Sequence, residues 1–282
     1  MADINIGNGE LTVTISTLGA QMLRIVDGQG RDRLWGGNKA IWGSHAPVLF
    51  PVAGGLTNDQ YHYDGKTYKM GRHGFARTSE FTVVAHTDHS ASFLLDTPQA
   101  NYPFDYAFLV HYSLDGNRLT VTYEMVNNGV GTMYASVGAH EAYAIDGDIT
   151  DWELVFDQKE RIETQELQDS KMTGATKLYD AHGDILPLSD DLFYCDTVVF
   201  TDLVSRGVTL RSDKHAPTVH VAYDGMDYLM IWKKPGAPFV CIEPWCNPPE
   251  PEGFAGDLTK KPGIIAIAPG DREKRAHVIT FG

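Results

Sequence analysis

The sequence predicts an all-β protein built as one large antiparallel β-sandwich, and three observations lead to this prediction. Short apolar runs of strand-type composition recur along the 282 residues, separated by Gly, Asn, Asp and Pro. Amphipathic patterns of helical period are nearly absent. No internal repeat or Pro- and Ser-rich linker interrupts the chain, so we expect a single domain over residues 1–282.

The first half of the chain alternates predicted strands with tight turns. Leu11–Ser16 (LTVTIS) alternates apolar residues with Thr and Ser, which is typical of a strand with one solvated face. Residues 61–70 (YHYDGKTYKM) predict a β-hairpin, because Asp64 and Gly65 readily adopt the positive φ of a two-residue turn. Residues 46–55 are broken by two prolines and are predicted as short strand and loop. Further strands are expected at residues 19–27, 81–85, 92–95, 108–114 and 119–126.

The second half continues in the same way. Residues 132–143 form an extended run, and a short helical turn is expected at residues 188–193. Residues 239–242 (FVCI) are apolar throughout, as in a buried strand. Other strands are expected at residues 152–156, Thr197–Phe200, 208–211, 219–223, 229–232, 264–267 and 278–281.

Composition and charge argue against several classes of protein. The net charge is −14 and no basic patch is visible, so neither nucleic acid nor an anionic membrane is an expected partner. No apolar run approaches the ~20 residues that span a bilayer, and the N-terminal stretch lacks the pattern of a signal peptide. The three cysteines contain no CxxC pair, so neither a disulfide framework nor a structural zinc site is expected. We therefore expect a soluble, cytoplasmic protein with reduced cysteines.

A carboxylate, Glu243, ends the apolar run in the segment 239–247 (FVCIEPWCN). A carboxylate at the end of a buried strand is costly unless it is paired or hydrogen-bonded. Two interpretations stay open: Glu243 meets solvent or a lysine at the mouth of the strand, or it is a general base in a cleft. In the second case Trp232 or Trp245 would offer an apolar surface there, although core packing explains each tryptophan equally well.

Two histidines stand in glycine- or alanine-rich segments beside an aromatic residue, His73 in GRHGFAR and His140 in VGAHEAY. The ordinary alternative for each is a surface position or a satisfied place in the core. Zinc sites usually show local pairs such as HxH or HExxH, which these segments lack, so no metal is expected. The chain contains neither a GxSxG nucleophile motif nor a phosphate-binding glycine loop.

The chain resembles the aldose 1-epimerase family of galactose mutarotase-like proteins, in particular its small bacterial branch. The resemblance covers nearly the whole length and runs through ISTLGAQMLRIVD, GRDRLW, APVLFPVAGGL, YHYDGKTYKMGRHGFAR, VGAHEAY, CDTVVF, FVCIEPWCN and KKPGIIAIAPGD. HGFAR and EPW are fairly specific, and the order and spacing of all these motifs strengthen the match. The family's fold is a large antiparallel β-sandwich, the galactose mutarotase-like supersandwich, in agreement with the strand pattern.

The resemblance also implies roles for individual residues. His140 matches the family histidine that acts as general acid on the sugar ring oxygen, and Glu243 matches the glutamate that acts as general base on the anomeric hydroxyl. His73 matches a second active-site histidine that helps to hold the substrate. Asp196 matches an aspartate that hydrogen-bonds sugar hydroxyls, although a turn-capping role explains it nearly as well. Trp232 is a candidate for stacking on an apolar face of the sugar.

Two positions depart from the family pattern. The family usually has an arginine in FPxxGRL, where this chain reads FPVAGGL, and Gly55 cannot make that arginine's charge-assisted hydrogen bonds. Arg72, directly before His73, is expected to supply the missing charge from another direction. Glu141 stands where a proline is common in this branch. It either raises the pKa of His140 or, by strand alternation, points away from it.

The resemblance implies an isomerase that interconverts the α and β anomers of a free hexose by acid–base catalysis, without metal or organic cofactor. One alternative is a hexose-6-phosphate 1-epimerase, against which the acidic chain and Gly55 argue. The other is a non-catalytic carbohydrate-binding or sensing protein that retains the fold. The missing arginine favours that reading, whereas His140 and Glu243 oppose it. The expected partner is a small-molecule sugar, and the sequence leaves open a monomer or a homodimer.

Overall fold

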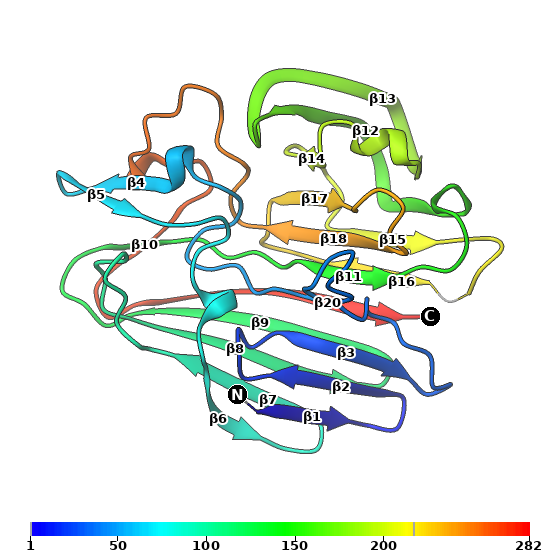
Figure 1. Cartoon of the computed structure of the whole chain (residues 1–282), viewed down its shortest axis with the longest axis horizontal. Helices are drawn as coiled ribbons and strands as arrows, with labels where there is room; N and C mark the ends of the chain where they lie inside the picture. Colours follow the sequence, from blue (N-terminus) through cyan, green and yellow to red (C-terminus); the bar gives the residue numbers. More distant parts are fainter. Residues whose placement is uncertain (1, 217) are drawn as a thin grey trace.

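The computed structural model describes residues 2–216 and 218–282, and its architecture is all-β (Figure 1). Within these ranges, every pairing between named strands is antiparallel. The strands form one sheet of 13 strands, one of three and two of two. The fold class predicted from the sequence is therefore confirmed.

The large sheet contains, in spatial order, β11 (Glu141–Ala144), β18 (Phe239–Trp245), β17 (Tyr228–Trp232), β14 (Thr197–Phe200), β12 (Glu153–Gln168), β15 (Gly207–Arg211), β16 (Val219–Ala222), β20 (Arg272–Phe281), β9 (Arg118–Asn127), β8 (Tyr106–Asp115), β7 (Ser90–Leu95) and β6 (Thr82–His86), with β13 (Lys171–Pro187) paired to β12. The smaller sheets are β1 (Asp3–Gly7), β2 (Leu11–Ser16) and β3 (Met22–Asp27); β4 (Gln60–Tyr63) and β5 (Lys66–Lys69); and β10 (Met133–Ala135) and β19 (Ile265–Ile267). Short 3₁₀ segments lie at Thr57–Asp59, Ala76–Thr78, Ile149–Asp151, Asp190–Phe193 and Leu258–Lys260. No helix in the described ranges is long and apolar enough to cross a membrane.

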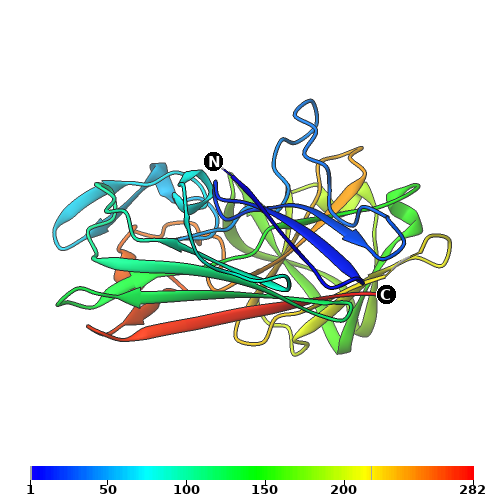
Figure 2. The same cartoon turned by 90° about the horizontal axis from the view of Figure 1, so that it is seen from below.

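The three-stranded sheet covers part of the large sheet, and this forms the sandwich. Figure 2 shows β1–β3, in dark blue, lying over the long strands β8, β9 and β20. Val13 and Ile15 of β2 belong to the same buried cluster as Phe93 of β7 and Val121 of β9, whereas Thr12 on the other face of β2 is exposed. Each such apolar side chain contributes roughly 1.5–3 kcal/mol by leaving water, so alternation along the strands decides which face is buried.

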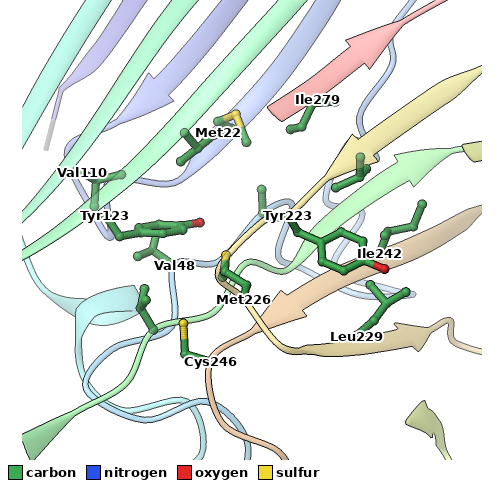
Figure 3. Packing of buried hydrophobic residues seen from close by; sticks show 14 of the residues in the cluster. Met22, Val48, Val110, Tyr123, Tyr223, Met226, Leu229, Ile242, Cys246 and Ile279 are labelled. Carbon is green, nitrogen blue, oxygen red and sulfur yellow. The ribbon is translucent and has the colours of Figure 1, made fainter. Parts of the chain in front are cut away.

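The core continues under the other end of the large sheet. Figure 3 shows Ile242 of β18, Tyr123 of β9 and Ile279 of β20 in one packed cluster, and each is at most 1% exposed. Strands β18 and β20 are not neighbours in the sheet order. The sheet therefore curls strongly enough to bring β18, near one end, to a common core with the interior strands β20 and β9, as twisted antiparallel sheets do.

Most predicted elements are present with small shifts at their ends. Leu11–Ser16 and Thr197–Phe200 match β2 and β14 residue for residue. The predicted hairpin is formed by β4 and β5, with φ values of 48° at Asp64 and 70° at Gly65. The helical turn expected at residues 188–193 is the segment Asp190–Phe193.

Three predictions need correction. Residues 46–55 carry isolated bridges at Leu49 and Phe50 in place of a strand in the described chain. The extended run at 132–143 is divided into β10 and β11, and the strand expected at 152–156 runs on to residue 168. Strands β1 and β13 were not predicted. In β13 most side chains are exposed or half-buried, so no apolar alternation marked it.

Strand β18 is buried along its whole length because β11 and β17 flank it and both of its faces are covered. Val240 and Ile242 point into the main core. Phe239 and Cys241 pack on the opposite face in a smaller cluster. Since side chains alternate along a strand, Glu243 lies on that second face.

Candidate active site

Two neighbouring strands bring His140 and Glu243 together. Glu141 of β11 pairs with Ile242 of β18, and continuing this antiparallel register by one residue sets His140 opposite Glu243. His140 Nδ1 and Glu243 Oε1 lie 3.4 Å apart, and the side chains are 11% and 2% exposed. The contact is not aligned as a hydrogen bond, because neither atom has a hydrogen-bond partner among the described residues.

Burial disfavours charge on both members of the pair. It lowers the pKa of His140 to about 3, and two nearby arginines act in the same direction. Burial raises the pKa of Glu243 well above its usual value, and the negative charges of Glu141 and Asp196 add to this. The two groups are close enough to titrate as a pair. Between the two pKa values the pair therefore holds one proton, and burial favours its place on the carboxyl.

The sequence GRHGFAR holds His73 beside this pair. The φ angles of His73 and Gly74 are 68° and 70°, and a Cβ at Gly74 would lie 2.2 Å from the Phe50 carbonyl oxygen, so glycine is required there. His73 Nδ1 accepts a hydrogen bond from the Gly54 amide at 3.1 Å, which leaves Nε2 as the donor. The ring meets that of His140 edge to face, with centroids 5.4 Å apart. Burial, and after it the neighbouring positive charges, lower the pKa of His73 well below its usual value.

Three tryptophans line the cavity around these rings. Trp42 stacks on His140 with centroids 5.3 Å apart and 23° between the planes. Trp232 meets the same ring edge to face at 5.9 Å, and Trp245 lies 5.6 Å from His73. The indole N–H of Trp245 donates to a backbone carbonyl, so its ring contributes an apolar surface to the cavity.

Asp196 and Trp232 are joined at the cavity wall. The register of β14 and β17 sets Thr197 opposite Trp232, and the Trp232 indole donates to Asp196 Oδ1 at 3.0 Å. Asp196 also adopts φ 77° and its amide donates to the Phe193 carbonyl, which ends a 3₁₀ segment. Asp196 thus shapes a turn and also lines the cavity, so the two interpretations offered by the sequence do not exclude each other.

Arg72 occupies the space in front of Gly55. A Cβ at Gly55 would lie 3.8 Å from Arg72 Nε, and Arg72 Nη2 donates to Ser170 Oγ at 2.6 Å, at the turn between β12 and β13. A second guanidinium, that of Arg77, lines the cavity and has no carboxylate partner within residues 2–216 and 218–282. One wall of the cavity is therefore basic in an otherwise acidic chain.

The residues singled out by the sequence, namely His140, Glu243, His73, Arg72, Asp196 and Trp232, all line one cavity of about 180 Å³. Pockets for drug-sized ligands are roughly 300–1,000 Å³, so this cavity suits a smaller molecule. The lining residues that the sequence did not single out include Trp42, Arg77, Leu167 and Ser170. Arg77 is the last residue of the HGFAR motif, so the sequence could have identified it as a site residue. Leu167 and Ser170 belong to a hairpin whose second strand was not predicted.

Glu141 does not face this cavity. Its side chain lies on the core face of β11, opposite Ile242, with His140 on the other face of the sheet. Of the two outcomes that the sequence left open for Glu141, strand alternation away from His140 is the one observed.

One group of side chains in the described ranges has the composition of a metal site. His140, Cys241 and Glu243 each place one ligand atom within 4.8 Å of the others. Tetrahedral zinc brings its ligand atoms to roughly 3.3–3.8 Å from one another. Burial and two nearby carboxylates raise the pKa of Cys241 well above its usual value, and a protonated thiol is a poor ligand. The group fits a metal badly, and catalysis without metal stays our prediction.

Comparisons in sequence and in fold point to one family. The family model for aldose 1-epimerase matches residues 3–257. The plasmid-encoded LacX protein of Lactococcus lactis subsp. lactis is 31% identical, with 99% of each chain covered. The structure of a galactose mutarotase related enzyme from Lactobacillus acidophilus has a TM-score of 0.94 at 33% identity, covering 100% of this chain and 97% of that one. A galactose mutarotase-like protein from Lactobacillus casei ATCC 334 has a TM-score of 0.94 at 27% identity, with 100% of both chains covered.

Proposed function

The chain belongs to the aldose 1-epimerase family, and from this premise we propose that it is an isomerase that interconverts the α and β anomers of a free hexose. The observation that carries the proposal is the opposed pair His140 and Glu243, 3.4 Å apart in one small cavity. Anomer interconversion needs one acid and one base close together, because the two oxygens that exchange protons are bonded to the same carbon.

The proposed reaction opens and recloses the sugar ring. Glu243 takes the proton of the anomeric hydroxyl while His140 gives a proton to the ring oxygen, and the C1–O5 bond breaks as the aldehyde forms. Rotation about C1–C2 presents the other face of the aldehyde. The ring then closes with the two roles reversed, so the pair ends with the protons it began with. Each well-placed group of this kind contributes about 10²–10⁴ in rate.

This cycle requires that the pair carry one proton. With that proton on His140, Glu243 is the base and His140 the acid. Burial favours the opposite arrangement, and a proton transfer between Oε1 and Nδ1 interconverts the two. We propose that Arg72, whose charge lowers the pKa of Glu243, and the sugar hydroxyls together stabilise the carboxylate when substrate is bound.

We assign the holding of the sugar to the remaining polar groups of the cavity. His73 Nε2 is free to donate because Nδ1 is occupied by the Gly54 amide. Asp196 is a hydrogen-bond acceptor for hydroxyls, and Trp232 offers a ring face beside it. Arg72 is proposed to take the place of the family arginine that Gly55 lacks.

A hexose 6-phosphate is the second candidate substrate, and Arg72 together with Arg77 favours it. Both guanidiniums line the cavity, and neither is paired with a carboxylate within residues 2–216 and 218–282. Phosphate binds guanidinium groups through strong paired hydrogen bonds. The carboxylates of Glu243 and Asp196 line the same cavity and oppose it.

Polarimetry on free and phosphorylated aldoses tests these proposals. Faster mutarotation of a free hexose than of its 6-phosphate supports the first candidate, and the reverse supports the second. Sugar binding without any rate enhancement would identify a non-catalytic sugar-binding protein and would refute the enzymatic proposal.

Arg72→Ala is expected to raise KM about 10–100-fold, with a smaller fall in kcat because Arg72 also helps to stabilise the Glu243 carboxylate. A hydrogen bond to a charged group contributes roughly 1.5–3 kcal/mol, and this one is proposed to hold substrate in the ground state as well as in the transition state. Arg161→Ala is the matched control, because Arg161 is exposed and pairs with Glu163 outside the cavity. A wild-type KM in the Arg72 variant would refute the role.

Dialysis against a strong chelator is expected to leave both kcat and the melting temperature unchanged. His140, Cys241 and Glu243 are the metal-site candidate, and their ligand atoms are spread more widely than zinc requires. The rate and the melting curve are measured before dialysis, after it and after adding back zinc. Loss of either property with recovery on zinc addition would contradict the prediction.

A further inference from the structure

A second acid–histidine pair lies in the core, on the opposite face of β11 from the cavity. Glu141 Oε1 and His277 Nε2 are 3.2 Å apart, and their side chains are 3% and 0% exposed. Strand β11 stands at one end of the large sheet and β20 lies well inside it, so the pair joins two parts of the sheet that are not neighbours. Figure 3 shows this core, with Ile242 opposite Glu141 in register, and Tyr123, whose ring stacks on His277.

The pair is poorly satisfied by its surroundings. In the part of the chain that the structure describes, Glu141 Oε2, His277 Nδ1 and the hydroxyl of Tyr143 lack hydrogen-bond partners. The 3.2 Å contact itself is not aligned as a hydrogen bond. A buried carboxylate in such a setting is costly, and buried polar groups without partners are few in native proteins and call for an explanation. Packing alone would be served better by an apolar residue.

His140 and Glu243 are each linked to Glu141 through the backbone, one along the chain and the other across the paired strands. His140 is the residue before Glu141, and Glu243 follows Ile242, the cross-strand partner of Glu141. A shift of β11 would therefore move His140 relative to Glu243. The charge of Glu141 also reaches the cavity face of β18. After burial it is the next cause that raises the pKa of Glu243, and it acts in the same direction on Cys241.

We propose that Glu141 and His277 are positioning residues for the proposed reaction: they hold β11 so that His140 stays opposite Glu243, and they keep the Glu141 carboxylate behind Glu243 on the other face of the sheet. The inference rests on the proposed function. It assigns to Glu141 a role that acts through Glu243, without contact with the sugar.

Other titratable groups face Glu243 and Glu141. Their own ionisation must be distinguished from the effect of the Glu141 charge on Glu243. Glu243 is faced by His140, His73, Asp196, Arg72, Arg77 and Cys241. Glu141 is faced by His277 of β20, Tyr112 of β8, Tyr123 of β9 and Tyr143 of its own strand. Burial and the charge of Glu141 raise the pKa values of all three tyrosines well above the usual value, so these hydroxyls keep their protons across an ordinary assay range.

The test is the pH profile of kcat/KM in Glu141→Gln. The wild-type rate should fall at high pH, where the pair loses its last proton from Glu243. Removing the negative charge of Glu141 makes Glu243 give up that proton more easily, so the alkaline limb should move to lower pH by about 0.5–1.5 units. Glu124→Gln is the matched control. Glu124 is nearly as buried but pairs with Arg272 and Lys274, so its loss should lower the melting temperature and leave the limb in place.

A second measurement does not need turnover. Titration of the Glu243 carboxyl carbon by ¹³C NMR, assigned with Glu243→Gln, should show the same displacement in Glu141→Gln. If wild type has no activity, the proposed function fails, and the titration still tests this inference. If Glu141→Gln does not fold, Glu141→Met replaces it: an apolar side chain of similar size removes the same carboxylate without burying an amide, and the midpoint should again fall. An unchanged midpoint in a folded variant overturns the inference.

Discussion

Replacing Glu243 with glutamine is expected to lower kcat for anomer interconversion by about 10²–10⁴-fold while leaving sugar affinity close to that of wild type. Glutamine keeps the shape and the hydrogen-bonding capacity of the side chain but cannot take the anomeric proton. The affinity should survive because His73, Asp196 and Arg72, which are assigned to hold the sugar, stay in place.

The change should not weaken the fold. Burial raises the pKa of Glu243, so the folded state binds this proton more tightly than the unfolded state. Wild type therefore loses stability as the pH rises from the usual carboxyl pKa to the raised pKa of Glu243. Glu243→Gln does not show this loss, because glutamine has no proton to release in this range. Above this window the variant should melt at the wild-type temperature or higher. An inactive variant that melts at lower temperature would point to misfolding and not to a lost base.

Binding and turnover can be followed independently. Three tryptophans, Trp42, Trp232 and Trp245, line the cavity, so intrinsic fluorescence should report sugar binding in a variant that does not turn over. Polarimetry gives the rate above the uncatalysed mutarotation. Glu163→Gln, at a half-buried position outside the cavity, is the control and should retain wild-type kcat. Wild-type kcat in Glu243→Gln would exclude this residue as the base.

Sequence patterns predicted the fold where strands have one buried face or two. Leu11–Ser16 was found because alternate residues pack against the opposite sheet, and β18 because both of its faces are covered. Strand β13 was missed for the opposite reason. Among the named strands it pairs only with β12, and most of its side chains are exposed. The sequence of β13 therefore shows no alternation of apolar and polar residues.

The candidate site could be predicted where a residue type is unusual in its segment. Glu243 stood out because a charge interrupts an apolar run, and His73 because of the glycine that follows it. Trp42 and Ser170 carried no such mark: each reaches the cavity through a turn or loop whose course depends on distant contacts, such as that of Ser170 with Arg72. Likewise the side on which Glu141 lies follows from strand register, which local sequence does not fix.

His140→Asn is expected to lower kcat by a similar factor of about 10²–10⁴, because asparagine fills part of the same space but cannot exchange a proton with the ring oxygen. Burial keeps the pKa of His140 at about 3, so the ring contributes no charge to stability near neutral pH and its loss should cost mainly packing against Trp42. Sugar affinity, followed by fluorescence of Trp232 and Trp245, should change little.

The double variant Glu243→Gln with His140→Asn decides whether the two residues act as one unit. Ring opening needs both proton transfers, so losing either one stalls the same step, and the second substitution should add little to the first. The double variant should therefore be slower than wild type by about the same 10²–10⁴ as either single variant, and not by the product of the two factors. The three rates are measured by polarimetry on one sugar at one pH, with the uncatalysed rate subtracted. Multiplicative losses would mean that the two groups act in separate steps, and the shared acid–base pair at 3.4 Å would then not be the catalytic unit.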